Sequence, residues 1–330
     1  MDFLNLKPGL SQVDIDNILN TYPLDRVQID DYIDENSLRL LNQQLFTARP
    51  DVAFRIYGHP FKDMSFISSL TNVRKLCLDC MYDAVENLDV LGKLTYLEDL
   101  RIDIYNQKDF SFLEKITDNL KKLSLNANKT SLDANKLLRF GGLEWLDIQD
   151  MKKNIHVIAE LKGLKYFRIK GITASSLEFI NSLHRLQELH IYGGKNDLTV
   201  LYSNKNIQHL LLSGIKGLDN LDLITSLPNL ESVKVQYISD ITSLPDLSEN
   251  HFLKDIELMS MKNLTDLSTA QFAPALEEFE YSCVSKELKP LDILPVIKNT
   301  TLKKCRIFFP SDKKNKEADS LCIQYGKSFN

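Results

Sequence analysis

One six-residue pattern recurs along the chain, and this repeat constrains the fold more than any other feature of the sequence. Apolar residues occupy the first, fourth and sixth positions of each hexad, as in LEWLDI at 143–148 and LKYFRI at 164–169. The hexads follow one another at steps of 21 to 26 residues, a period that indicates a solenoid of stacked repeats. Their fourth residues are Leu76, Leu100, Leu123, Leu146, Phe167, Leu189, Leu210, Val233, Ile256, Phe279 and Cys305.

The spacing within a hexad predicts an extended strand. Side chains alternate along a strand, so the fourth and sixth residues share one face while the third and fifth residues point to the other. One short strand cannot bury its apolar face alone, but stacked copies form a parallel sheet over a continuous core. The segments between hexads, such as 65–72, 178–185 and 222–229, carry apolar residues three and four apart, which predicts short helical turns.

These hexads resemble those of leucine-rich repeat proteins, and the repeat length is similar to that of the internalin-type and phosphatase-regulator-type families. The resemblance implies an α/β solenoid: a horseshoe with a parallel concave β-sheet, short helical or irregular convex segments and a helical N-terminal cap. The subfamily stays open, because the family's usual Asn or Cys at the ninth repeat position is present at Asn128 but mostly replaced elsewhere. The apolar replacements are Met81, Met151, Ile172, Ile238, Met261 and Val284.

The ends of the chain differ from the middle, as solenoid ends must, because each end exposes an unpaired apolar layer. We expect an N-terminal cap at 1–50, about 12 leucine-rich repeats at 51–309 and a C-terminal cap or tail at 310–330. Periodic leucines predict helices over 10–21 and 34–50 within the cap, with Asp34 or Asn36 as a helix N-cap and a possible first strand at 24–29. We expect the charged stretch 311–319 to be a solvated loop.

The outward hexad positions define a candidate binding patch on the concave face. Neighbouring strands lie about 4.8 Å apart, so outward side chains of consecutive repeats are expected to touch. The expected patch combines large amphipathic side chains with an arginine, which is the composition of an interface hot spot. Scattered exposed aromatic residues on a long solenoid are the alternative interpretation. The patch consists of Trp145, Tyr166, Arg168, His190, Tyr192, His209 and Leu211.

A second, acidic patch is expected on the same face. It consists of Asp255, Glu257, Glu278 and Glu280 on two adjacent strands. Like charges on neighbouring strands are destabilising. We therefore expect either relief from Lys234 and Arg306 on the flanking strands or a basic partner.

The sequence shows few of the residue patterns that catalysis, metal binding or nucleic-acid binding require. The net charge is −5 with a pI of about 5.8, so no electrostatic drive toward nucleic acid exists. Cys77 and Cys80 form a C-x-x-C pair, but structural zinc needs four ligands. The five cysteines are irregularly spaced, which predicts reduced residues. Asp147, Glu188, His190 and His209 are a candidate acid–base set on the concave face, but an open solenoid face offers neither a closed pocket nor exclusion of water. We expect no catalytic residue, no metal and no cofactor.

The expected function is therefore non-catalytic binding of a folded protein through the concave face. Alternatives are a bacterial immunity protein that neutralises a toxin, a secreted effector acting on a host protein, and an adaptor or regulatory subunit of an enzyme complex. The first residues lack a basic region followed by an apolar one, so we expect a cytoplasmic protein with no membrane association. We further expect a monomer.

Overall fold

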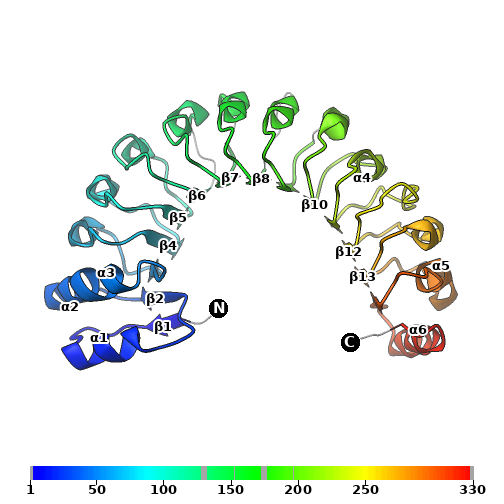
Figure 1. The fold of residues 1–330 in the computed structure, drawn as a ribbon, viewed down its shortest axis with the longest axis horizontal. Coiled ribbons are helices and arrows are strands. Elements are labelled where there is room, and N and C mark those ends of the chain that lie inside the picture. The colour runs from blue at the N-terminus through cyan, green and yellow to red at the C-terminus, as the bar shows by residue number, and fades with distance from the viewer. Residues whose placement is uncertain (1–2, 128–131, 152, 172–176, 196, 328–330) are drawn as a thin grey trace. The chain divides into compact units, whose positions relative to one another are not determined.

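The computed structural model describes residues 3–127, 132–151, 153–171, 177–195 and 197–327. The chain forms two compact units, Met1–Leu164 and Lys165–Asn330. In each unit, parallel strands run side by side in chain order, and short helical segments lie on one side of them (Figure 1). Each repeat therefore supplies one strand and one return segment, as the sequence predicts.

The first unit contains, within its described residues, strands β1 (Phe3–Asn5), β2 (Arg26–Ile29), β3 (Ala53–Tyr57), β4 (Lys75–Met81), β5 (Asp99–Ile104), β6 (Lys122–Asn126) and β7 (Trp145–Gln149). Its α-helices are α1 (Gln12–Leu19), α2 (Glu35–Leu40) and α3 (Phe46–Ala48), with a π-helical turn, η1 (Leu41–Leu45), between α2 and α3. Its 3-10 helices are η2 (Ser65–Ser69), η3 (Leu88–Lys93), η4 (Ser111–Glu114), η5 (Ala134–Leu137) and η6 (Ile155–Glu160).

The second unit contains, in the part that the structure describes, strands β8 (Tyr166–Lys170), β9 (Glu188–Tyr192), β10 (His209–Ser213), β11 (Ser232–Gln236), β12 (Asp255–Met259), β13 (Glu278–Ser282) and β14 (Lys304–Ile307). Its α-helices are α4 (Asp222–Ser226), α5 (Leu294–Ile297) and α6 (Asp312–Gln324). Its 3-10 helices are η7 (Glu178–Ser182), η8 (Thr199–Ser203), η9 (Ser268–Phe272) and η10 (Pro290–Ile293).

The strand register keeps equivalent hexad positions side by side. In the first unit Leu76 pairs with Leu100 and Leu100 with Leu123; in the second unit Leu189 pairs with Leu210. The fourth residues of the hexads, like the sixth, are at most 3% exposed, so they form the core beneath the sheet. We call the opposite side of the sheet, which carries the third and fifth hexad positions, the open face.

The N-terminal helices form where the sequence predicts them. Ser11 and Asp14 make a capping box at the start of α1. Asp34 is the N-cap of α2, because its carboxylate accepts a hydrogen bond from the Ser37 backbone N–H at 2.9 Å. The possible first strand at 24–29 exists as β2, and β1 adds a further strand beside it that the hexad pattern does not predict.

The C-terminal stretch corrects one expectation. Residues 311–319 do not form a solvated loop but begin helix α6. The Asn315 side chain donates to the Phe309 carbonyl and accepts from the Phe309 backbone N–H at 2.7 Å, which fixes the start of the helix against the preceding segment. Ala318 and Cys322 are buried beneath it. These two small side chains are the buried residues of α6, and the rest of the helix is mostly charged or polar. The sequence therefore shows no clear amphipathic pattern, which is why the helix was not predicted.

A different device replaces the asparagine of the ninth repeat position. The described apolar residues there are at most 5% exposed and pack into the core; they are Met81, Met151, Ile238, Met261 and Val284. Asn128 and Ile172 lie outside the described residues. The preceding residue has left-handed backbone, with φ from 50° to 69°, at Asp150, Gly171, Gly193, Gly214, Tyr237, Ser260 and Cys283. Several of these residues donate their backbone N–H to the next strand, as Ser260 does to Ser282 at 3.0 Å. Main-chain bonds thus satisfy the turn without a side-chain amide.

Aspartates recur just before the return helices and accept hydrogen bonds from backbone N–H groups in the first turn. Asp133 accepts hydrogen bonds from the Asn135 backbone N–H, from Asn154 of the next repeat and from Lys153, at 2.9 to 3.0 Å. These bonds lower the pKa of Asp133 to about 2, with the bond from Asn154 as the largest cause. Asp63, Asp109, Asp197 and Asp266 have lowered pKa values because serine or threonine two residues later donates to them.

We expect Asp133→Asn to weaken the protein at pH 6 and to lose this disadvantage in acid. The carboxylate has a lower pKa in the folded state than its value of about 3.9 in the unfolded chain. Its contribution is therefore complete above about pH 5 and is lost as the pH falls toward 2. Thermal melts of both proteins between pH 2 and 6 should converge at the acidic end; parallel curves would contradict this role of Asp133.

Candidate functional site: the open face of the sheet

The open face of the second unit carries a connected cluster of side chains on β8 and β9. His190 lies between Tyr166 and Glu188: its Nδ1 is 3.1 Å from the Tyr166 hydroxyl, and its Nε2 is 2.8 Å from Glu188 Oε1. When Nε2 carries the proton that faces the carboxylate, Nδ1 can accept the tyrosine O–H. The imidazole and phenol rings also meet edge to face, with centroids 5.0 Å apart. The cluster is held in one arrangement by these contacts.

Arginine and a second tyrosine extend this cluster along the same strands. The Arg168 guanidinium lies 5.1 Å from the centroid of the Tyr192 ring, within the range of a cation–π contact. Tyr192 also meets His190 edge to face. All of these side chains are half-buried, so each has one surface packed and another in solvent.

The remaining predicted patch residues make contacts of their own. His209 on β10 lies near it and hydrogen-bonds Ser232 at 2.8 Å. Leu211 is only 8% exposed, so it supports the face and offers little contact area. Trp145 belongs to β7 of the first unit, where it is half-buried. There Arg101 lies 5.5 Å from its ring centroid, a contact between strands that the hexad map places two repeats apart.

The candidate acid–base residues are placed for packing and hydrogen bonding. Asp147 is 2% exposed and accepts a hydrogen bond from the Ser124 hydroxyl at 3.1 Å, so its carboxylate is covered by the sheet. It lies in the first unit, whereas Glu188 and His190 lie in the second. Glu188 and His190 contact each other in the cluster described above, with His190 Nε2 against the Glu188 carboxylate.

The acidic patch lies on β12 and β13 and is largely neutralised by neighbouring strands. Lys234 pairs with Glu257 at 2.5 Å and Arg306 pairs with Glu280 at 2.9 Å, as the sequence predicts. A third cation, Lys304, pairs with Glu278 at 2.6 Å. Among the described residues, Asp255 makes no ion pair of its own. Burial raises the pKa of the Asp255 carboxyl, and the glutamates at 278, 257 and 280 raise it further.

We expect Asp255→Asn to stabilise the protein at neutral pH by about 0.5 kcal/mol, the size of one solvent-screened like-charge contact between strands. Because the folded-state pKa is raised, the ionised carboxylate costs stability above that pKa and costs none below the unfolded value of about 3.9. Urea unfolding at pH 7.5 and at pH 3 checks this. The gain should be present at the higher pH and absent at the lower one; an equal change at both would assign it to packing.

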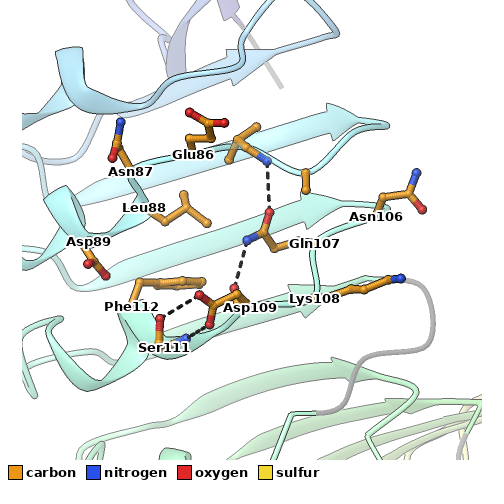
Figure 2. Close-up of a pocket in the computed structure, with 12 residues that line it drawn as sticks. Glu86, Asn87, Leu88, Asp89, Asn106, Gln107, Lys108, Asp109, Ser111 and Phe112 are labelled. Carbon is orange, nitrogen blue, oxygen red and sulfur yellow. Dashed lines mark hydrogen bonds between the residues drawn. The ribbon is translucent and has the colours of Figure 1, made fainter.

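A pocket of about 740 Å³ lies in the first unit, among the loops that follow β4 and β5 (Figure 2). Gln107 crosses it: the side-chain amide donates to the Asp109 carbonyl at 2.9 Å and accepts from the Val85 backbone N–H at 3.1 Å. Asp109 in turn accepts from the backbone and hydroxyl of Ser111. These bonds join the loops of two repeats, and they occupy the polar groups of Gln107 and Asp109 in holding the fold.

An exposed aromatic pair stands next to this pocket along the chain. Tyr82 and Tyr105 are 57% and 44% exposed, and their rings stack with centroids 5.2 Å apart at an angle of 13°. The hexad map does not include them because they follow the strands instead of lying within the hexads. Their sequence signal is the recurrence of tyrosine just beyond two consecutive strands.

The described part of the chain holds neither a metal-binding cluster nor a helix that could span a membrane. Among the described residues, no three His, Cys, Asp or Glu side chains are arranged to hold a metal ion. Cys77 lies half-buried on β4, and burial raises the pKa of its thiol to about 12, while the side chain of Cys80 lies outside the described part. In the same part of the chain, every helix is too short or too polar to cross a bilayer.

Solved structures of other proteins share this architecture. No protein-family model and no curated protein matches the sequence. The structure of an internalin from Listeria monocytogenes is similar, with a TM-score of 0.54 and 17% identity over 90% of this chain and 88% of that chain. The structure of the Toll–Spätzle complex of Drosophila is similar with a TM-score of 0.56 and 13% identity, over 94% of this chain and 46% of that chain.

Identities this low show a shared fold and carry no residue-level correspondence. The shared fold is nevertheless the one that the hexads predict: parallel strands in chain order, a core of fourth and sixth hexad residues, and short helical returns. The protein therefore has the leucine-rich repeat fold.

Proposed function

We propose that the protein is a non-catalytic binding module that holds a folded protein partner against its open face. The leucine-rich repeat fold is typically a protein-binding module. The observation that carries the proposal is the cluster of Tyr166, Arg168, His190 and Tyr192, with Glu188 as its hydrogen-bonding support. His209 and, in the first unit, Trp145 are further proposed contacts.

Two physical features of this cluster favour binding. Tyrosine, tryptophan and arginine are the side chains enriched in interface hot spots, because they bury large area and still make polar contacts. Hydrogen bonds and ring contacts already hold the cluster side chains in place, so a partner would lose less side-chain entropy on binding. One of the similar structures is itself a complex, that of Toll with Spätzle, which agrees with a binding role.

The double variant Tyr166→Ala/Arg168→Ala should weaken partner binding by roughly 30-fold or more, which corresponds to the loss of one hot spot of about 2 kcal/mol. The partner is first captured from the native organism with the wild-type protein and identified by mass spectrometry. Its affinity for both proteins is then measured by calorimetry. A 1:1 complex is expected.

The matched control is Tyr202→Ala/Arg185→Ala, which removes the same side-chain types from exposed positions outside the strands of the same unit, Tyr202 in η8 and Arg185 between η7 and β9. This control should bind like the wild type. Equal affinities for all three proteins would refute the proposed site, and a loss in the control alone would move the site away from the strands. Trp145→Ala, tested separately, reports whether the first unit contributes.

The identity of the captured partner separates the finer possibilities. A toxin encoded next to the gene of this chain would make it an immunity protein, and rescue of cells that express the toxin would then be expected. A host protein would make it an effector, and an enzyme subunit would make it an adaptor or regulator. In each case the binding surface under test is the same.

A further inference from the structure

Another pocket, of about 420 Å³, lies on the open face of the first unit, over strands β2 to β6, which run side by side (Figure 1). The hollow follows from the sizes of the outward side chains. Ala53 on β3 stands beside Arg26 in the strand register, and Cys77 on β4 stands beside Arg101. Two short side chains among long ones leave a depression in the sheet surface. We call this hollow the basic pocket.

The lining of the basic pocket carries more cations than carboxylates. One carboxylate is already bound by a residue outside the lining, because Arg49 donates to the two oxygens of Asp51 at 2.9 and 2.8 Å. Burial raises the pKa of the Cys77 thiol to about 12, so the floor adds no negative charge at neutral pH. The cations of the lining are Arg26, Lys75, Arg101 and Lys122, and its carboxylates are Asp25, Asp51 and Asp99.

Three of these cations make no ion pair with a carboxylate of the described residues. The Nε of Arg26 is buried without a hydrogen-bond partner there, and the guanidinium lies 5.1 Å from the Phe3 ring centroid. Lys75 donates to the backbone carbonyl of Asp51 at 2.8 Å, a neutral acceptor. Lys122 is exposed; it stands beside Asp99 in the register, but that carboxylate pairs with Arg101 at 3.3 Å. The pocket therefore has unused capacity to bind an anionic oxygen.

The basic pocket adjoins a side chain that is already a proposed contact. Arg101 lines the pocket and lies 5.5 Å from the Trp145 ring centroid. Lys122 stands beside Trp145 in the register of β6 and β7. A partner that covers Trp145 also covers Lys122 and the adjoining rim. Burying these cations without a counter-charge costs free energy, so a partner that binds here has to supply an anion.

We infer that the basic pocket receives a carboxylate side chain, Asp or Glu, of the protein partner. The inference rests on the proposed function, because it takes the occupant from the partner that the open face holds. A planar guanidinium accepts both oxygens of a carboxylate at once, and an ammonium adds a point charge beside them. The contact favours partners that present an acidic residue at this point over those that present a basic one.

The charge of the pocket is tested at Lys122, whose exposed side chain can be shortened without disturbing the core. Calorimetry with the captured partner compares the proteins at about 50 and about 300 mM NaCl, which screens charge to different degrees. Lys122→Gln should weaken binding by about 10-fold at the lower salt and by less at the higher salt. The matched control, Lys121→Gln, changes an exposed lysine outside the lining and should bind like the wild type. Equal affinities of Lys122→Gln and the wild type at both salts would overturn the inference.

A second pair of variants tests the pocket with and without the partner. Ala53→Glu puts a carboxylate of the chain itself into the pocket, and Ala53→Gln fills the same volume without charge. Ala53→Glu should bind the partner at least about 10-fold more weakly than Ala53→Gln, because like charges meet. Without the partner, Ala53→Glu should melt about 2 °C higher than Ala53→Gln at pH 7. This gain should disappear as the pH falls toward 3, since pairing lowers the folded-state pKa of the new carboxyl and protonation then removes its charge.

The melting comparison separates a failure of this inference from a failure of the proposed function. Equal melting of the two Ala53 variants at pH 7 would show that the pocket does not favour a carboxylate, even if the partner binds elsewhere on the open face. Equal affinities of Tyr166→Ala/Arg168→Ala and the wild type would refute the cluster of the second unit and leave the melting result standing.

Lysine acetylation, read by mass spectrometry, identifies the source of the anion. The bound partner should protect Lys75 and Lys122 from the reagent and leave Lys121 reactive. Reactivity of Lys75 and Lys122 that is unchanged by the partner would overturn the inference. Protection of both lysines by inorganic phosphate alone, to the same extent as by the partner, would also overturn it, because the occupant would then be a free anion.

Discussion

Replacing Phe167 by alanine is expected to lower the free energy of unfolding by about 3–5 kcal/mol, the usual cost of emptying a buried phenylalanine site. Phe167 is the fourth hexad residue of β8 and is fully buried. Its ring meets Phe179 of η7 edge to face, with centroids 6.3 Å apart, so it joins the strand to its own return helix. The substitution leaves a cavity between these two elements that neither can fill by a change of rotamer.

Urea unfolding followed by circular dichroism measures this loss, with the slope of the transition recorded to detect any separate unfolding of one unit. The control is Phe272→Ala, the same substitution at a position 58% exposed at the end of η9. The control should change stability by no more than about 0.5 kcal/mol. A loss of under 1 kcal/mol for Phe167→Ala would mean that the core assigned to the fourth hexad positions is wrong.

The second large effect is expected at Asn299, a side chain that is 1% exposed. Its amide nitrogen donates to the carbonyls of Ala270 and Ala273, both at 2.8 Å, which lie at the end of the neighbouring return segment. Its carbonyl oxygen accepts from the backbone of Thr301 and Leu302. Asn299→Ala leaves these buried groups unpaired at once, so we expect a loss of about 2–4 kcal/mol.

Asn263→Ala is the matched control for this substitution, because Asn263 is exposed. It should leave the unfolding midpoint nearly unchanged. Thermal melts and urea titrations of the two variants and the wild type make the comparison. Equal stability of Asn299→Ala and the wild type would show that water can replace the lost hydrogen bonds.

Asn299 also shows what the repeat pattern could not predict. It stands three residues before its hexad, as do Asn204 and Asn250, which are likewise buried. In other repeats the same position holds leucine, for example Leu183 and Leu227. A single sequence does not distinguish a buried amide from an exposed one, because the difference depends on which carbonyls of the neighbouring repeat lie within reach.

The candidate site was predicted in part. The alternation of side chains along the hexad placed Tyr166, Arg168 and His190 on the open face, because strand geometry has a period of two residues. It also placed Leu211 there, but that side chain is covered by its neighbours. The two-residue alternation along a strand predicts only the direction in which a side chain points. Its exposure depends on the size and tilt of the side chains on adjacent strands.

Local sequence alone predicts the repeat, the strands of the hexads, the core beneath them and the sign of every charge on the open face. These follow from local periodicity, which each repeat carries within its own residues. Features that depend on contact between repeats appear only in the folded protein: the ion pairs of the acidic patch, the His190 cluster and the covering helix α6. The ion pairs and the contact between Tyr166 and His190 join residues 23 to 26 positions apart, and only the stacking of one repeat on the next brings such residues together.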